Sequence, residues 1–522
     1  MEKFFNTTGP CNPEDHYLLP PADRLMHADL SRYIKNKLYW VLHAPRQTGK
    51  TTFLQNWVRE INAGYEALAC YVTVEVCQSF PKAEESIPAI CTVIQSSAER
   101  QLGKKLIPST DGELSPSVQL QKTLQNWALL CAPKPLVVLF DEVDVLEDQA
   151  MVSFLRQLRG GFADRGVGKF PVSIALVGMR DLRDYLIKSK DGDPVNPGSP
   201  FNIKESSATI TNFSREDVHN LMAQHVDATG QKFEKGAVDL IYDLTRGQPW
   251  LANSLAKKCH WDLCPHSEMI TIQHILEAKE LLIKERAVHL DSLAERLRDP
   301  RIYKIVANIL SGGLDPTMAT TRDFELTMDL GLVALERGTP IISNPIYREV
   351  IPRVMTWGMQ CAIPEPEFKW KKNDGTLDMD ALMEAFQEFW SLHSDIWEQK
   401  ADYTEAFPHL LLMAFLQRVA NGGARIEREY AAGRGRMDLA IQYGGEWTII
   451  EVKLVNHLGR QKVLDQGLKQ IGQYRERMAP EAAGYLVVFD RTKAGREKPW
   501  EERLIREEMT AGDGRSVVLI GG

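Results

Sequence analysis

Apolar and polar positions follow two patterns in the first part of the chain. Short, almost continuous apolar runs at residues 39–43, 136–140 and 172–178 each end in polar residues. Runs of this kind are typical of strands buried on both faces of a parallel sheet. The segment 53–58 instead places apolar residues at helical spacing, after the first run and its polar loop. The alternation of strands and helices predicts an α/β domain whose parallel sheet is covered on both faces.

The same two patterns return in the last third of the chain, where they predict a second α/β domain. Apolar residues at helical spacing mark helices at 382–390, 403–419 and 468–477. Strands are predicted at 426–430, 437–441, 448–453 and 484–490. The core of this domain therefore has the predicted order α-β-β-β-α-β.

The chain between these two regions is expected to be mainly helical. The pattern predicts a helical lid over 213–285 and a small winged-helix-like module over 290–357. Such a module either enters a DNA major groove or packs within the molecule as a gate, and we favour the gate. The resulting organisation is a parallel-sheet core at 1–205, a lid at 206–285, a winged-helix-like module at 286–360, a linker at 361–380 and a C-terminal domain at 381–522.

The composition is that of an ordinary globular protein and favours a cytoplasmic location. Of 522 residues, 44% are hydrophobic and 25% charged, and the formal net charge is −8. No apolar run approaches the roughly 20 residues that cross a bilayer, and no signal peptide is evident, so no membrane partner is expected. The eight cysteines show no disulfide framework spacing. Four clustered side chains match no standard zinc spacing and are expected to pack at a helix end: Cys259, His260, Cys264 and His266.

A phosphate-binding loop follows the first apolar run. It meets the pattern GxxxxGK[ST] with one departure, because alanine stands at the first glycine position. Gly49 allows the backbone amides to curve around phosphate, Lys50 neutralises the β and γ oxygens, and Thr51 offers its hydroxyl to Mg²⁺. The residues expected to bind ATP here are Ala44, Pro45, Arg46, Gln47, Thr48, Gly49, Lys50, Thr51 and Thr52.

The second apolar run ends in two acids that complete a site for nucleotide hydrolysis. Asp141 is expected to hold the Mg²⁺ shell, and Glu142 to polarise the attacking water. Arg180 follows the third run, where an arginine can sense the γ-phosphate. The nucleotide is expected at the C-terminal ends of the strands. A further arginine could reach the nucleotide of a neighbouring subunit in a homo-oligomer, and the choice stays open among Arg156, Arg159 and Arg165.

Two carboxylates and a lysine lie at the ends of two predicted strands in the C-terminal region. They are Asp438, Glu451 and, two residues further on, Lys453. Carboxylates that converge while ionised need a cation between them, usually Mg²⁺, with Mn²⁺ as a substitute. The backbone carbonyl of Val452 can complete the coordination, and Lys453 can orient or deprotonate a water that attacks phosphorus. The pattern indicates a metal-dependent phosphodiesterase, in which Arg425, Arg428, Arg434 and Arg436 could hold a nucleic-acid backbone.

The first 350 residues resemble the signal-transduction ATPases of the STAND and archaeal-ATPase type within the AAA+ class. The phosphate loop, the acidic strand end and the turn Gly247-Gln248-Pro249 carry the resemblance. In those families a Gly-x-Pro turn lies near the adenine, and a strand-end arginine occupies the position of Arg180. The resemblance therefore implies that Pro249 and Arg180 contribute to the nucleotide site. The alternative, that Gly247 and Pro249 only end one helix and begin the next, stays open.

Residues 380–510 resemble the PD-(D/E)xK nuclease superfamily, in particular its RecB-like and AAA-associated branch. The order of elements and the acid–acid–lysine set described above carry the resemblance. Gln470 and Tyr474 fit the Gln-x-x-x-Tyr element of that branch. The resemblance implies that Gln470 positions the metal shell or the phosphate. It also implies a metal-binding acid on the first helix, for which Glu405 is the best match.

Taken together, the two resemblances imply a bacterial AAA-like ATPase fused to a PD-(D/E)xK nuclease. Such a chain is expected to be an ATP-regulated, metal-dependent DNA endonuclease, suspected of a role in defence against mobile DNA. RNA is not excluded as the substrate, since the metal chemistry reads only a phosphodiester. Two alternatives stay open. One is a STAND-like switch that holds ATP as a structural ligand, with a nuclease effector that a partner triggers. The other is an inactive nuclease fold that only binds DNA.

Overall fold

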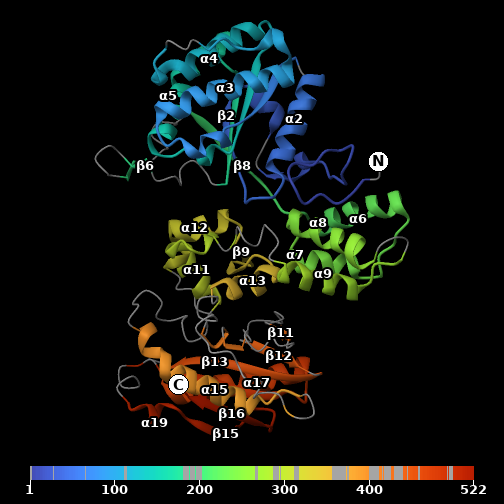
Figure 1. Cartoon of the computed structure of the whole chain (residues 1–522), viewed down its shortest axis with the longest axis vertical. Helices are drawn as coiled ribbons and strands as arrows, with labels where there is room; N and C mark the ends of the chain where they lie inside the picture. Colours follow the sequence, from blue (N-terminus) through green and yellow to red (C-terminus); the bar gives the residue numbers. More distant parts are fainter. Residues whose placement is uncertain are drawn as a thin grey trace. The chain divides into compact units, whose positions relative to one another are not determined.

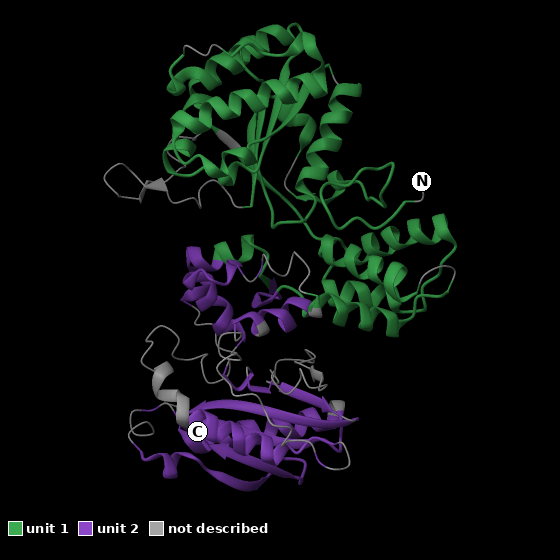
Figure 2. Ribbon diagram, in the orientation of Figure 1, with its two compact units in different colours: residues 1–285, 325–334, 343–345 green, residues 286–324, 335–342, 346–522 purple. Residues whose placement is uncertain are grey.

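The computed structural model of the chain describes residues 3–26, 29–64, 66–110, 114–179, 187–188, 194–195, 203–264, 268–285, 293, 295–310, 317–355, 372, 376–398, 411–413, 415–416, 425–427, 439–443, 445–455, 459–490, 492 and 498–521. The chain forms two compact units, shown in green and purple in Figure 2. Unit 1 consists of Met1–Glu285, Glu325–Ala334 and Ser343–Pro345. Unit 2 consists of Arg286–Phe324, Leu335–Ile342 and Ile346–Gly522.

Unit 1 is built on a six-stranded sheet with the strand order β1-β8-β2-β5-β4-β3. The strands are β1 (Leu25–Met26), β2 (Tyr39–His43), β3 (Leu68–Thr73), β4 (Leu136–Asp141), β5 (Ser173–Gly178) and β8 (Lys204–Ile210). Neighbouring strands are parallel except for β1 against β8. The predicted parallel sheet is therefore confirmed, while β3 and β8 were not predicted. A separate short hairpin consists of β6 (Ile187–Lys188) and β7 (Pro194–Val195).

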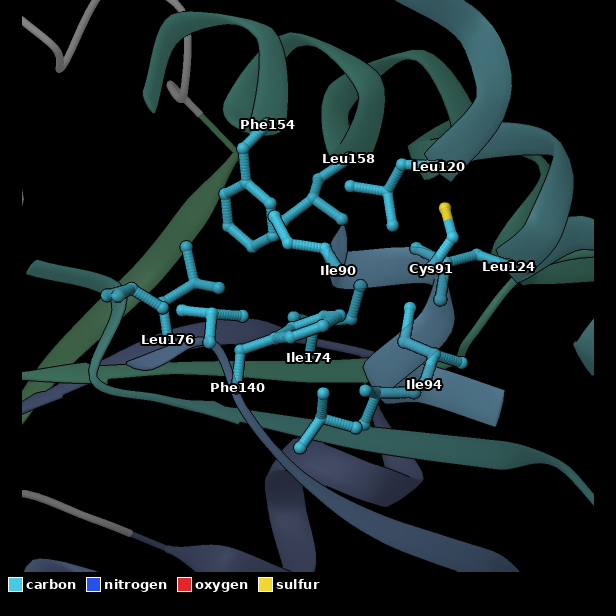
Figure 3. Packing of buried hydrophobic residues seen from close by; sticks show 14 of the residues in the cluster. Ile90, Cys91, Ile94, Leu120, Leu124, Phe140, Phe154, Leu158, Ile174 and Leu176 are labelled. Atoms are coloured by element: carbon cyan, nitrogen blue, oxygen red, sulfur yellow. The ribbon is translucent and has the colours of Figure 1, made fainter. Parts of the chain in front are cut away.

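Helices cover both faces of this sheet because its strands present apolar residues to both sides. The helices before the lid are α1 (Leu30–Lys35), α2 (Lys50–Gly64), α3 (Ala83–Leu102), α4 (Pro116–Cys131) and α5 (Asp148–Gly161). The apolar residues of α2 pack on one face with Trp40 and Leu139. Those of α3, α4 and α5 pack on the other face around Phe140, whose ring meets the Phe154 ring edge-on at 5.2 Å (Figure 3).

The lid is helical, as predicted. Its helices are α6 (Arg215–Thr229), α7 (Ala237–Thr245), α8 (Pro249–Lys258), which runs into a π-helical turn (Cys259–Leu263), and α9 (Ile272–Lys284). Ser214 begins α6 with a capping box that it forms with Asp217. Within the lid, His260 hydrogen-bonds to Gln231, and the Cys264 thiol donates to the carbonyl oxygen of Glu268. These side chains pack at a helix end, while His266 lies outside the described residues.

The elements expected of a winged-helix-like module follow in the predicted order. They are α11 (Pro300–Leu310), α12 (Arg322–Asp329), β9 (Val333–Glu336), β10 (Thr339–Ile342) and α13 (Pro345–Met355). Strands β9 and β10 pair as a two-stranded sheet. The turn between them contains Arg337 and Gly338, both with positive φ.

The C-terminal part of unit 2 is a six-stranded mixed sheet with the order β11-β12-β13-β14-β16-β15 (Figure 1). Its elements are α15 (Met379–Glu398), β11 (Arg425–Glu427), β12 (Leu439–Tyr443), β13 (Glu446–Val455), α17 (Arg460–Met478), β14 (Ala483–Asp490), α19 (Trp500–Arg503), β15 (Arg506–Thr510) and β16 (Ser516–Gly521). The first three strands form an antiparallel meander, and β14 and β16 continue it in parallel. Strands β15 and β16 extend the sheet beyond the predicted order of elements.

Two long helices, α15 and α17, pack on opposite faces of this sheet. Ile449 on β13 and Leu486 on β14 share a core with apolar residues of α17. Phe489, an odd number of residues from Leu486, faces the other side, where Trp390 of α15 lies with its ring 4.7 Å away. Helix α17 approaches the sheet through Gly467, where a Cβ atom would lie 2.4 Å from Leu486. None of the described helices is both long and apolar enough to cross a membrane.

Candidate nucleotide and nuclease sites

The phosphate loop connects β2 to α2, and its lysine, Lys50, hydrogen-bonds back to the start of the loop. The buried Lys50 Nζ donates to the carbonyl oxygens of Ala44 and Pro45 at 2.7 and 2.9 Å. Gly49 has a φ of +97°, a conformation that favours glycine. Ala44 is not among the described residues with positive φ. Alanine therefore fits where the motif has its first glycine, and the departure from the pattern leaves the loop intact.

The other predicted loop residues lie at its tip and at the start of α2. Arg46 and Gln47 are exposed, and Gln47 has a φ of +60°. Thr48 is buried, and its hydroxyl donates to Pro45 O at 2.9 Å. The Thr52 hydroxyl accepts a hydrogen bond from Cys11 N at 3.0 Å. The loop is thus held by its own threonine and by the N-terminal segment.

The acidic end of β4 meets the start of α2. Thr51 Oγ1 donates to Asp141 Oδ2 at 2.8 Å, and Asp141 is completely buried. Burial raises the pKa of Asp141, and the Thr51 hydroxyl and Lys50 oppose that rise. A hydroxyl and a carboxylate are the hard oxygen ligands that Mg²⁺ prefers. These residues therefore fit a magnesium ion that accompanies a nucleotide phosphate.

Glu142 has an unusual backbone and an unusual side-chain environment. Its φ of +57° lies in the left-handed region, which costs a non-glycine residue about 1–2 kcal/mol. Its amide donates to Asp141 Oδ1 at 3.0 Å. Burial, followed by the charges of Asp144 and Asp141, raises the pKa of Glu142 to about 7. Strained backbone and a raised carboxyl pKa are both typical of active-site residues.

Arg24 is a buried cation at the phosphate loop that the sequence patterns did not single out. It donates to Thr48 O at 3.0 Å and to Thr211 O at 2.9 Å. Its guanidinium carbon lies 4.7 Å from the centre of the Phe213 ring, and burial lowers its pKa to about 10. A lone arginine within the segment 20–25 belongs to no short phosphate-binding pattern. Its neighbours in the sequence, Asp23 and Leu25, give no signal of its burial.

Contacts from Arg24 continue into the turn of the lid. Phe213, under the guanidinium, donates its amide to Gly247 O at 2.8 Å. Gly247 has a φ of +72°, and a Cβ atom there would lie 1.8 Å from Phe213 O. The turn leads into Pro249, the buried first residue of α8. The phosphate loop and the lid turn are therefore linked through two residues, Arg24 and Phe213, while a place for Pro249 beside adenine stays a prediction.

The arginines predicted to contact nucleotide, in this subunit or in a neighbouring one, lie in different environments. Arg180 lies outside the described residues, although β5, which precedes it, lies between β2 and β4. Arg165 donates to the carbonyl oxygens of Lys37 and Phe162, at 2.7 Å each. Those contacts give Arg165 a structural role within its own subunit. Arg156 and Arg159 are exposed on α5.

The nuclease prediction centres on β13, where Glu451 and Lys453 occupy alternate positions. Their side chains lie on the same face of the sheet as Ile449, the face that α17 covers. Glu451 is completely buried, and Lys453 Nζ donates to its Oε1. A buried carboxylate needs a cationic partner, because an isolated charge is costly to remove from water. Val452 turns its side chain to the opposite face, so only its backbone is available to this site.

Helix α17 brings the predicted glutamine and tyrosine to the same face of the sheet. Gln470 is partly buried, and Tyr474, one turn further on, is buried in the core that α17 shares with β13 and β14. Asp438 and Glu405, the other predicted metal ligands, lie outside the described residues. The same holds for Arg428, Arg434 and Arg436, whereas Arg425 pairs with Gln442 between β11 and β12.

The sheet order, the phosphate loop and the acidic end of β4 define a P-loop ATPase-like domain. A family model described as "AAA-like domain" matches residues 34–352, and the chain belongs to this family. Residues 384–492 match a second model, described as "Domain of unknown function (DUF8371)".

Solved structures also resemble the chain, at low sequence identity. The Walker-type ATPase paby2304 of Pyrococcus abyssi is 15% identical, with a TM-score of 0.48 over 66% of this chain and 99% of that one. Cdc6p from Pyrobaculum aerophilum is 12% identical, with a TM-score of 0.35 over 63% and 91% of the two chains. The RuvB Holliday junction branch migration motor of Thermotoga maritima is 14% identical, with a TM-score of 0.32 over 62% and 91%. No curated protein matches the sequence.

Proposed function

We propose that this protein is a nucleotide-regulated, metal-dependent nuclease that cleaves phosphodiester bonds in DNA. The carrying observation is the pair Glu451 and Lys453 on the α17-covered face of β13, with the carboxylate buried and the ammonium in contact with it. A carboxylate of this kind can hold a metal ion, and a lysine beside it can orient the attacking water.

The proposal requires a second carboxylate opposite Glu451. In the antiparallel ladder between β12 and β13, Leu439 pairs with Ile450 and Ala440 with Ile449, so each step forward on β12 is a step back on β13. Asp438 precedes Leu439 in the sequence, and Glu451 follows Ile450. Asp438 is therefore the residue that this register favours as the second ligand. Glu405 is proposed as a third.

Each group then has a distinct proposed role. Mg²⁺ or Mn²⁺, held by the carboxylates and the Val452 carbonyl, would supply Lewis acidity toward the phosphate. Lys453 orients the attacking water and offsets charge on the pentavalent phosphorus. From α17, Gln470 positions the metal shell or the phosphate.

The nucleotide site supplies the regulation. Lys50, Thr51 and Asp141 would hold MgATP, and Glu142 would polarise the attacking water. With its pKa near 7, the Glu142 carboxyl is suited to accept a proton near neutrality. The connection from the phosphate loop through Arg24 to the lid gives ATP binding a route by which it changes the lid. A homo-oligomer and a role in defence against mobile DNA are further parts of this proposal.

One contact favours a second candidate function, a switch that holds ATP as a structural ligand. Residues 325–334 belong to unit 1 and contain the turn after α12. In that turn, Gly331 lies so near the phosphate loop that a Cβ atom would be 2.9 Å from Pro45. Asp329 lies 3.9 Å from His43, the last residue of β2. A turn in this position can respond to nucleotide directly, and tightly retained nucleotide with slow turnover would favour this candidate.

Cleavage assays test the nuclease proposal. The purified protein is incubated with Mg²⁺ or Mn²⁺ and with circular, linear or single-stranded DNA or RNA, with and without ATP. Lys453→Ala should abolish cleavage and leave ATP turnover near wild type. Lys469→Ala, which alters an exposed lysine on α17, is the matched control and should cleave normally. Retained cleavage in Lys453→Ala would refute the site, and metal-independent DNA binding without cleavage would favour an inactive nuclease fold.

A further inference from the structure

Tyr71 lies on β3 beside the acidic end of β4, and its backbone is fixed in place. In the parallel ladder between the two strands, Tyr71 pairs with Leu139 and Thr73 with Asp141. Gln101 of α3 accepts from Tyr71 N at 2.9 Å and donates to Tyr71 O at 2.7 Å. The side-chain amide of Gln101 thus completes the backbone hydrogen bonding of Tyr71 and sets the strand position from which the phenol extends.

The Tyr71 hydroxyl donates to Asp141 Oδ2 at 3.1 Å. Thr51 meets the same oxygen at 2.8 Å, and the Glu142 amide meets the other carboxylate oxygen at 3.0 Å. Three donors, from α2, from β3 and from the backbone just after β4, therefore hold one buried carboxylate. The phenol is the donor in this contact, because an ionised carboxylate oxygen can only accept.

Asp141 and Thr51 are the residues that fit the magnesium ion of a bound nucleotide. A Mg²⁺ ion held by Thr51 and Asp141 would take a lone pair from each side chain, so their mutual hydrogen bond would open. The contact from Tyr71 is to the same oxygen, Asp141 Oδ2, whose second lone pair remains available for it. It persists as a hydrogen bond that orients the carboxylate while the metal is exchanged. Partners of this kind, which hold a metal ligand in place, affect metal affinity or activity by about 10–100-fold.

We propose that Tyr71 is a positioning residue for the nucleotide-associated metal and acts through Asp141. For turnover, this inference rests on the proposed ATP hydrolysis; for metal binding, it rests only on the nucleotide site. Removal of the hydroxyl leaves Asp141 with one fewer donor and a less firmly fixed carboxylate, so metal binding weakens while the loop that holds phosphate is unchanged.

The test compares Tyr71→Phe with Tyr33→Phe, whose hydroxyl contacts Ser206 at 2.7 Å, on β8 and away from Asp141. The full-length proteins are titrated with ADP in EDTA, and then with Mn²⁺ at saturating ADP, with free Mn²⁺ followed by its EPR signal. The Mn²⁺ affinity is expected to fall about tenfold in Tyr71→Phe. The metal-free ADP affinity should equal that of the wild type, and both affinities should be unchanged in Tyr33→Phe.

Turnover adds a second readout. Tyr71→Phe should have a lower kcat at limiting Mg²⁺ that excess Mg²⁺ restores, with an unchanged KM for ATP. Binding of ADP reports the folded fraction in the same sample, so partial unfolding does not imitate the effect. Wild-type Mn²⁺ affinity in Tyr71→Phe overturns the inference. A wild-type protein that binds Mn²⁺ with ADP but does not hydrolyse ATP overturns the proposed hydrolysis and leaves the Mn²⁺ titration of Tyr71→Phe decisive for this inference.

Discussion

Gly247→Ala is the substitution that most directly tests the link between the phosphate loop and the lid. Gly247 has a φ of +72°, and an added Cβ would lie 1.8 Å from the carbonyl oxygen of Phe213. Real Cβ atoms essentially never approach another heavy atom closer than 3.0 Å, and here the neighbour is backbone that cannot turn aside. The turn or the Phe213 backbone must therefore move.

The structure offers a control that separates the clash from the strain. Gly230, which ends α6, has a φ of +75°, and its Cβ position has nothing within 4 Å. Alanine at either position incurs the left-handed penalty of about 1–2 kcal/mol. Only Gly247→Ala also disrupts the 2.8 Å hydrogen bond from Phe213 N to Gly247 O, worth about 1 kcal/mol, and adds the clash. We expect its total cost to exceed that of Gly230→Ala by about 1.4 kcal/mol or more, a tenfold change in an equilibrium constant.

Native-state hydrogen exchange on peptides from α7 and α8 measures this cost locally. Exchange in the lid should be at least about tenfold faster in Gly247→Ala than in Gly230→Ala. Because Phe213 also lies under Arg24, ATP affinity should fall in Gly247→Ala and stay near wild type in Gly230→Ala. Equal exchange and equal ATP affinity in the two variants would refute the reasoning.

Three further variants test other parts of the account. Lys50→Ala should abolish ATP binding, measured by calorimetry, because it removes the cation that lies within the phosphate loop. Binding at wild-type affinity would contradict this prediction. Glu142→Gln should retain ATP binding and slow hydrolysis by roughly 10²–10⁴-fold, the usual contribution of a positioned base, in a phosphate-release assay; unchanged turnover would remove Glu142 from the chemistry. Phe140→Ala should destabilise unit 1 by about 3–5 kcal/mol in urea unfolding, because the ring is completely buried between the sheet and α5; a loss below about 1 kcal/mol would mean that the core refills the cavity.

The nucleotide site could be predicted because its residues fall within two short patterns, each contiguous in the sequence. The loop from Ala44 to Thr52 and the acidic end of β4 are short patterns that the local backbone requires. Arg24 and Tyr71 could not be found in this way. Each reaches the site from a separate element, Arg24 by hydrogen bonds to carbonyl oxygens and Tyr71 by contact with Asp141. Hydrogen bonds of that kind can be made by several types of side chain from any element, so they leave no motif of fixed spacing in the sequence.

The predicted strands are mostly continuous apolar runs, but β3 and β16, which are also largely apolar, were missed along with strands that polar residues interrupt. β14 has a buried apolar run and was predicted nearly to its ends. β15, Arg506–Thr510, is an edge strand of mostly charged and exposed residues, so no apolar pattern marks it. β8 carries Lys204 and Glu205 at its start and is fixed by its partners β1 and β2. Edge strands depend on tertiary pairing more than on their own pattern.

The central claim is that one chain couples a nucleotide site to a nuclease site, and the most direct test is cleavage as a function of nucleotide state. DNA cleavage with Mg²⁺ is measured without nucleotide, with ATP, with ADP and with a non-hydrolysable ATP analogue, for the wild type and for Lys50→Ala. The account predicts that the cleavage rate of the wild type changes with nucleotide and that Lys50→Ala cleaves at one rate in all four conditions. Wild-type cleavage that is equal in all four conditions, or an absence of metal-dependent cleavage in every condition, would contradict it.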